Sequence, residues 1–171
     1  MSNRIEPVTD GLDERESLIA WLDYHRATLL WKCEGLTDDQ LKLRSVPPST
    51  LSLLGLLRHM CEVERSWFRI RFAGEDVSHD YYTDARQDDD FDDLDSAPVA
   101  EVLARFDDEC ERARVIVAKA GSLEDTGPGG YIRDGRPFSL RWILTHMIEE
   151  YARHNGHADL LREAIDGSTG D

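Results

Sequence analysis

Apolar residues recur at intervals of three and four along four stretches of the chain, which is the spacing of amphipathic helices. No stretch alternates apolar and polar residues over the length of a half-buried strand. Glycine or proline lies at each boundary between the helical stretches. The pattern therefore predicts an all-α protein with helices from about Leu12 to Glu34, Ser49 to Ile70, Ser96 to Val117 and Ser139 to Ile165.

Four helices that each carry one apolar stripe bury those stripes best against one another, so we expect a four-helix bundle. The connection between the second and third helices, residues 74–96, is long for such a bundle and predicts a crossover or a partial lid. Its acidic run DDDFDDLD favours a solvated loop, and the later Gly-rich stretch TGPGGYIRDGRP favours a connector. We expect one domain over residues 1–171, with its core at about 11–167.

The charge of the chain limits its partners. The formal net charge of −15 comes from 35 acidic and 20 basic residues, so phosphate backbones and anionic membranes would repel the protein. We therefore expect neither nucleic acid nor a membrane as a partner. The charged N-terminus and the lack of a long apolar run predict a cytoplasmic, soluble protein. The three cysteines are widely spaced within helical patterns, which favours reduced packing residues.

Candidate chemistry gathers in the segment HMIEEYARHNGH of the last helix. His154 lies on the apolar seam of that helix and should point inward, and Glu150 lies one turn earlier on the same face. A carboxylate buried there requires a positive partner. His59 lies on a narrow line of small and polar residues along the second helix, beside a gap left by Gly55. The spacing therefore predicts a divalent metal site at His59, Glu150 and His154.

Two imidazoles and one carboxylate leave coordination positions open and suit catalytic zinc first, with nickel, manganese and ferrous iron as alternatives. His146 and His157 compete for the ligand role, because they lie one turn from Glu150 and His154 on the same helix. Each could instead hydrogen-bond to a ligand or carry a proton.

The segment LLRHMCEVE and the block SLRWILTHMIEEYARHNGHADLLREAIDG resemble the DinB-like superfamily of metal-binding four-helix bundles, and the resemblance covers almost the whole chain. It implies that the metal ligands are His59, Glu150 and His154. Many relatives carry a histidine where this chain has Glu150. The glutamate resembles the branch that includes mycothiol-dependent maleylpyruvate isomerase.

This resemblance implies a thiol-dependent S-transferase or isomerase that acts on small electrophiles with mycothiol or bacillithiol. A homodimer is expected by analogy with similar bundles. Two alternatives stay open: a metal-dependent hydrolase or non-haem iron oxygenase, and a non-catalytic metal-binding interaction module whose site a fourth ligand closes. The arginines that could hold a carboxylate of the thiol or the substrate are Arg65, Arg69, Arg141 and Arg153, with Arg65 and Arg153 preferred.

Overall fold

Helices account for most of the chain that the structure describes. The computed structural model describes residues 4–81, 89–92, 94, 96–130 and 134–170. Its mainly helical character confirms the fold class expected from the apolar spacing. In the described ranges, no helix has both the length and the apolar character that crossing a membrane requires. The elements are α1 (Glu14–Cys33), α2 (Asp38–Lys42), α3 (Leu53–Glu64), the π-helical segment η1 (Arg65–Phe72), α4 (Val99–Lys119), β1 (Thr126–Gly130), β2 (Pro137–Ser139) and α5 (Leu140–Asp166).

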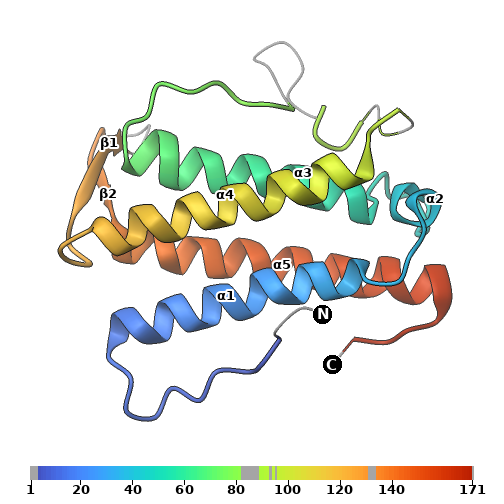
Figure 1. The fold of residues 1–171 in the computed structure, drawn as a ribbon, viewed down its shortest axis with the longest axis horizontal. Coiled ribbons are helices and arrows are strands. Elements are labelled where there is room, and N and C mark those ends of the chain that lie inside the picture. The colour runs from blue at the N-terminus through green and yellow to red at the C-terminus, as the bar shows by residue number, and fades with distance from the viewer. Residues whose placement is uncertain (1–3, 82–88, 93, 95, 131–133, 171) are drawn as a thin grey trace.

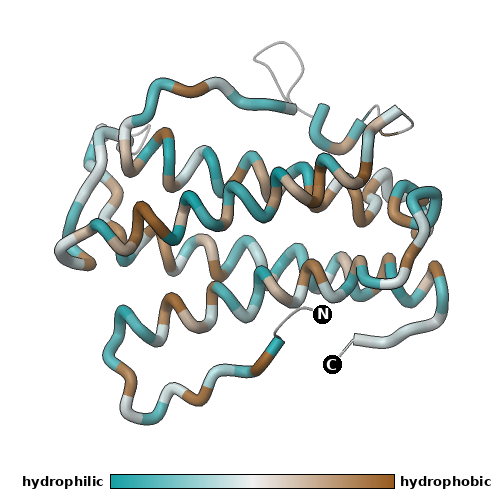
Figure 2. Tube along the Cα trace, viewed as in Figure 1, coloured by the Kyte–Doolittle hydropathy of each residue, from teal (hydrophilic) through white to brown (hydrophobic). Residues whose placement is uncertain are grey.

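The long helices lie side by side along the molecule (Figure 1). α1 packs mainly against α5, α3 packs mainly against α4, and α3 also contacts α5. Hydrophobic and hydrophilic residues alternate along each of these helices in Figure 2, because each helix turns an apolar face towards its neighbours. Every long helix contributes fully buried side chains, which include Leu22, Leu29, Leu57, Met60, Phe106, Ile143 and Tyr151.

Polar caps fix the ends of α1 and α5 where the sequence places them. The Asp13 carboxylate accepts a hydrogen bond from the Glu16 amide at 2.8 Å, and the Glu16 carboxylate accepts one from the Asp13 amide at 2.9 Å. This reciprocal pair begins α1. Ser139 caps α5, and Gly167 ends it with a φ of 81°, a left-handed conformation that glycine adopts without strain.

The second predicted helix begins later than expected. Ser52, and not Ser49, supplies the cap, because its hydroxyl accepts a hydrogen bond from the Gly55 amide at 3.1 Å. The helix therefore begins at Leu53, and it continues without a break as η1.

The Gly-rich stretch, expected to be a connector, contains strand β1 and the first residue of β2, which form a small sheet beside the helices. β1 pairs antiparallel with β2, with Thr126 opposite Ser139. A Cβ atom on Gly127 would lie 2.2 Å from the carbonyl oxygen of Phe72, so β1 packs with its backbone directly on the end of η1. Only a residue without a side chain allows this approach, and for that reason no alternation of side chains marks the strand.

Charged residues also lie inside the helical core. The Glu64 carboxylate accepts hydrogen bonds from Nε and Nη2 of Arg26, each at 2.7 Å, and from the Tyr151 hydroxyl at 2.8 Å. One oxygen of Glu109 accepts hydrogen bonds from Nε of Arg65 and Nη1 of Arg69, both at 2.9 Å. We call these residues the buried ion network. Its ion pairs and hydrogen bonds join α1, α3, η1, α4 and α5.

Candidate metal centre

Three side chains meet where α3 and α5 pack together. His59 lies in the middle of α3, and Glu150 and His154 lie four residues apart on one face of α5. One possible ligand atom from each residue lies within 4.8 Å of the other two. The structure thus brings together the residues that the sequence analysis assigned to a metal site.

The side chains of this cluster are oriented towards one another. Oε2 of Glu150 lies 3.5 Å from Nε2 of His154. The ring centroids of His59 and His154 are 4.8 Å apart, with an angle of 63° between the rings. The side chains of His59, Glu150 and His154 retain 24%, 17% and 11% of their exposure. The cluster is therefore partly desolvated but still in contact with solvent.

His59 is held from its other side by the connection between η1 and α4. Nδ1 of His59 lies 2.7 Å from Oδ2 of Asp90, a carboxylate that is only 3% exposed. The Phe91 ring stacks on the imidazole with a centroid distance of 4.8 Å. Phe91 also fills the space beside Gly55, because its Cδ1 lies 3.3 Å from the point where a Cβ on Gly55 would stand. The gap predicted from the sequence is thus occupied by an aromatic ring.

His154 is kept neutral by its surroundings. Burial lowers the pKa of His154 to about 4, and the neighbouring His59, His157 and Arg153 act in the same direction. At neutral pH the contact with Glu150 is therefore no ion pair, and the imidazole retains a lone pair for a metal. Nδ1 of His154 lies 3.4 Å from Nδ1 of His157, so Nε2 is the nitrogen that faces Glu150.

His146 lies beside the cluster. Its Nε2 is 3.4 Å from Oε1 of Glu150, and its ring packs against Trp67 and Trp142 with centroid distances of 4.6 and 4.8 Å. With Glu149 and Glu150 it forms a second group of possible ligands, but Glu149 is 47% exposed and is paired with Arg153. Among the described residues, the group at His59 has three donors, and neither His146 nor His157 is one of them.

The arginines proposed from the sequence all have acidic partners. Arg65 belongs to the buried ion network, whereas Arg153 is 56% exposed and adjacent to His154 in sequence. Of these two, Arg153 is therefore the better placed to exchange its partner for a ligand. The pairs are Arg65 and Arg69 with Glu109, Arg141 with Glu14, and Arg153 with Glu149.

The cysteines of the chain are free, buried and poorly suited to act as nucleophiles. Burial raises the pKa of Cys33 to about 12. It also raises the pKa values of Cys61 and Cys110, and nearby acidic groups act in the same direction. Because the thiolate is the reactive form, a thiol reaction at this protein needs a thiol from elsewhere.

The cluster fits a divalent cation on two grounds. Two imidazoles and a carboxylate are ligands of zinc and related ions, and one possible ligand atom from each residue lies within 4.8 Å of the other two. The buried Oδ1 of Asp90 has no hydrogen-bond partner in the described ranges. A carboxylate that lacks a partner there is costly unless a positive charge lies nearby.

Sequence reasoning missed Asp90. It lies in the acidic run that we expected to be solvated, and nothing in that run distinguishes it from its neighbours. The signal that could have found it is the aromatic residue Phe91, because an apolar ring within a run of carboxylates indicates that the segment packs on the protein.

The protein is mainly helical and carries a half-buried cluster of two histidines and a glutamate that could hold a metal ion. A family model described as mycothiol-S-transferase matches residues 17–167, a range that includes every candidate ligand. The chain therefore belongs to the mycothiol-S-transferase family, a DinB-like family, as the sequence resemblance indicated. No curated protein gives a significant match to the chain.

Proposed function

We propose that the protein is a metal-dependent S-transferase that joins mycothiol, or a related thiol such as bacillithiol, to small electrophilic molecules. The observation that carries this proposal is the approach of His59, Glu150 and His154 to within 4.8 Å in a chain of the mycothiol-S-transferase family. A DinB-like four-helix bundle with such a site also suits an isomerase that adds a thiol to a double bond and later releases it.

His59, Glu150 and His154 would hold the ion, which we propose to be zinc, with nickel, iron or manganese as alternatives. When bound, such an ion lowers the pKa of a coordinated thiol and makes the thiolate available at neutral pH. Three donors from the chain leave room for further ligands, which is the arrangement of catalytic rather than structural zinc sites.

The residues around the site orient its donors. The Asp90 carboxylate contacts Nδ1 of His59. His146 contacts Oε1 of Glu150, whereas His154 contacts Oε2 of the same carboxylate. Each of these donors is therefore left with one atom directed into the cluster. The neutral state of His154 at pH 7 means that no proton has to leave before this residue binds a cation.

The nucleophile comes from the thiol substrate, because the cysteines of the chain are buried and protonated. In the transfer, the sulfur forms a bond to an electrophilic carbon, the bond to the leaving group breaks, and the thiol proton is released. Arg153 is the residue that we propose for a carboxylate of the thiol or the substrate. Arg65 could take this role only by leaving the buried Glu109, which would lose one of its two arginine partners.

A hydrolase or an oxygenase could use the same donors, but these reactions consume water or oxygen instead of a thiol. The test supplies zinc-loaded protein with mycothiol, bacillithiol or glutathione and with chlorodinitrobenzene, and it measures the thioether formed. We expect product with mycothiol or bacillithiol, and loss of the rate on removal of zinc. No turnover with any of the three thiols, or an equal rate without metal, would contradict the proposal.

Matched variants tie this activity to the site. Glu150→Gln and His154→Ala should each lower the rate by about 100-fold or more, because each removes a donor from the cluster. Glu163→Gln removes the same charge as Glu150→Gln from an exposed position of α5 and should leave the rate unchanged. Equal rates in Glu150→Gln and Glu163→Gln would show that Glu150 has no role.

A further inference from the structure

The connection between η1 and α4 reaches His59 through one buried carboxylate. Asp90 is 3% exposed, and its Oδ2 lies 2.7 Å from Nδ1 of His59. A carboxylate that accepts a hydrogen bond from His59 at this position favours the tautomer in which Nδ1 carries the proton. The lone pair of that imidazole then lies on Nε2, the nitrogen that remains for the cluster with Glu150 and His154.

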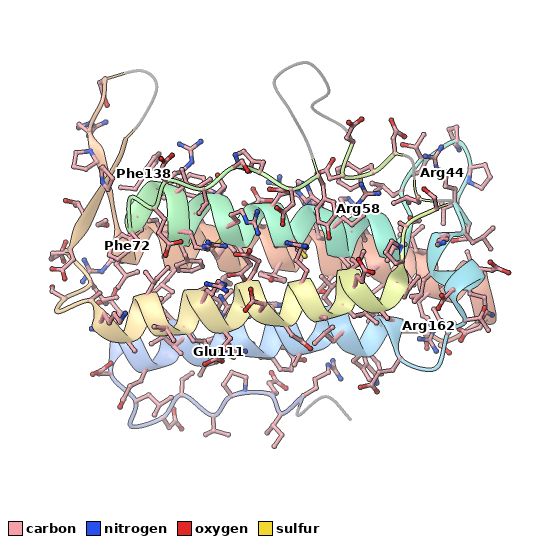
Figure 3. All side chains as sticks on the ribbon, turned by 45° about the horizontal axis from the view of Figure 1, so that its top comes forward. Arg44, Arg58, Phe72, Glu111, Phe138 and Arg162 are labelled. Atoms are coloured by element: carbon pink, nitrogen blue, oxygen red, sulfur yellow. The ribbon has the colours of Figure 1, made fainter. Side chains whose placement is uncertain are left out.

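The chain around Asp90 is fixed by contacts on both of its sides. Arg58 donates hydrogen bonds to the carbonyl oxygens of Asp89 at 2.8 Å and Asp92 at 3.0 Å. Figure 3 labels Arg58 beside the connection that passes over α3. The Phe91 ring stacks on His59 and packs against Gly55. The contacts of Arg58 and Phe91 therefore position residues 89–92 so that the Asp90 carboxylate lies against Nδ1 of His59.

Only one of the two oxygens of the Asp90 carboxylate has a hydrogen-bond partner among the described residues. Oδ1 of Asp90 is buried and has no hydrogen-bond partner within the part of the chain that the structure describes. Two carboxylates, Asp90 and Glu150, flank the two imidazoles of the cluster, and imidazoles that bind a metal are uncharged. One divalent cation would balance the charges of both carboxylates. Glu150 would bind it directly, and Asp90 would act on it through His59.

We propose that Asp90 is a positioning residue that orients His59 for metal binding through Nε2, so that residues 89–92 and the metal site stabilise each other. This inference rests on the metal site of the proposed function. If Asp90 tightens metal binding, a bound metal must by linkage tighten the docking of residues 89–92 to the same degree. Asp90 is then part of the site and more than one charge of a solvated loop.

The test compares zinc dissociation constants of full-length variants, measured by competition with a chromophoric chelator. Removal of a carboxylate that orients a ligating histidine typically weakens metal binding by roughly 10- to 100-fold, which we expect for Asp90→Ala and Asp90→Asn. Asp90→Glu should recover part of the affinity. Asp92→Asn is the matched control: it removes the same charge two residues away, where the carboxylate is 56% exposed and paired with Arg44, and should change the affinity less than about 2-fold.

Two further measurements separate orientation from general damage to the fold. In 15N spectra of the zinc-loaded parent, His59 should be protonated at Nδ1 and bound through Nε2, and this signature should be lost in Asp90→Ala. Zinc should also slow amide exchange at residues 89–92 in the parent but not in that variant. The unfolding free energy of each metal-free variant, from urea titration, shows whether the loss of affinity merely follows a loss of stability.

The outcomes distinguish this inference from the proposed site. If Asp90→Ala binds zinc within 2-fold of the parent while His59→Ala does not bind it, the metal site stands and the role of Asp90 is refuted. If His59→Ala also binds zinc like the parent, the metal site itself is refuted, and the inference fails with it. A loss of affinity in Asp92→Asn equal to that in Asp90→Asn would reduce the effect to long-range charge and overturn the proposal.

Discussion

Two groups of polar side chains lie among the helices, and they balance their charges in different ways. In the buried ion network, Glu64 is matched by Arg26, and Glu109 by two further arginines. In the candidate metal centre, which comprises His59, Glu150 and His154 with Asp90 beside them, the carboxylates Glu150 and Asp90 face histidines instead. In the first group, arginine side chains supply the positive charge, although Oε2 of Glu109 has no hydrogen-bond partner among the residues that the structure describes. In the second group, neither carboxylate is paired with a lysine or an arginine in the described ranges.

This difference separates a structural cluster from a binding site. A carboxylate that is already paired with arginine gains little from binding a further cation. Removing one partner of such a pair leaves a charge buried in the core without its counter-charge. A carboxylate that faces neutral imidazoles can accept a cation, and its site is partly open to solvent. The fold should therefore depend on the first group, and ligand binding on the second.

The largest expected effect breaks the buried ion network. Glu64→Gln removes the buried counter-charge of Arg26 and leaves it, within the described part of the chain, only the partly exposed Asp23 as an acidic partner. Breaking a buried pair in this way typically lowers the unfolding free energy by about 3–5 kcal/mol. Urea denaturation followed by circular dichroism measures it. Glu111→Gln is the control, because Glu111 is 67% exposed in its pair with Arg114 and should contribute less than about 1 kcal/mol. Similar losses in the two variants would show that the network does not support the fold.

The next largest effect concerns the candidate metal centre, where a substitution should weaken metal binding more than it lowers stability. His154→Ala removes one of the three donors and should weaken zinc binding by at least about 100-fold, equivalent to about 2.7 kcal/mol. The metal-free variant should lose much less unfolding free energy than Glu64→Gln does, because no charge is left unpaired. Metal content after dialysis and chelator competition measure the affinity. Full zinc occupancy in His154→Ala would contradict the site.

The sequence allowed the parts of the candidate metal centre that depend on local spacing to be predicted. The four-residue interval between Glu150 and His154 fixes their common face on any helix, and Ser139 caps the start of α5 as expected. His59 could be added because small residues on its helix face left room for a polar side chain. These inferences need no knowledge of which distant segments meet.

Asp90 and β1 could not be found in this way. Asp90 stands out only through its contact with His59, which lies 31 positions earlier. In the sequence it is one aspartate among many. β1 has no side-chain pattern, because its backbone lies so close to η1 that only glycine fits at Gly127 and Gly129. The partners of Glu64 and Glu109 were also missed, since acidic and basic residues on a helix look the same whether they are buried or solvated.

A third prediction concerns the pH dependence of the metal-free protein. The pKa of His154 is lowered to about 4 in the folded state from an ordinary value near 6.5, so the unfolded chain binds more protons between these values. The unfolding free energy should therefore fall as the pH is lowered from about 6.5 towards 4. His154→Gln should lose this component and show a flatter profile. Identical profiles in urea titrations of the parent and His154→Gln between pH 7 and pH 4 would contradict it.

The smallest expected effect concerns the thiol inside the buried ion network. Sγ of Cys110 lies 3.9 Å from Oε1 of Glu64, and burial followed by the charge of Glu64 raises the pKa of Cys110. A metal would do the opposite to a thiol bound at the metal centre. Cys110→Ala should therefore lower the unfolding free energy by only about 1 kcal/mol and leave thioether formation unchanged.

The same contrast predicts that native Cys110 reacts slowly with an aromatic disulfide reagent at pH 8 and reacts rapidly once the chain is unfolded in urea. Because Cys33 and Cys61 are also buried, the count of reactive thiols should rise from near zero to all three cysteines in the same transition. Fast labelling of Cys110 in the folded protein, or a loss of thioether formation in Cys110→Ala, would mean that the buried ion network takes part in the chemistry. The division between a structural cluster and a binding site would then fail.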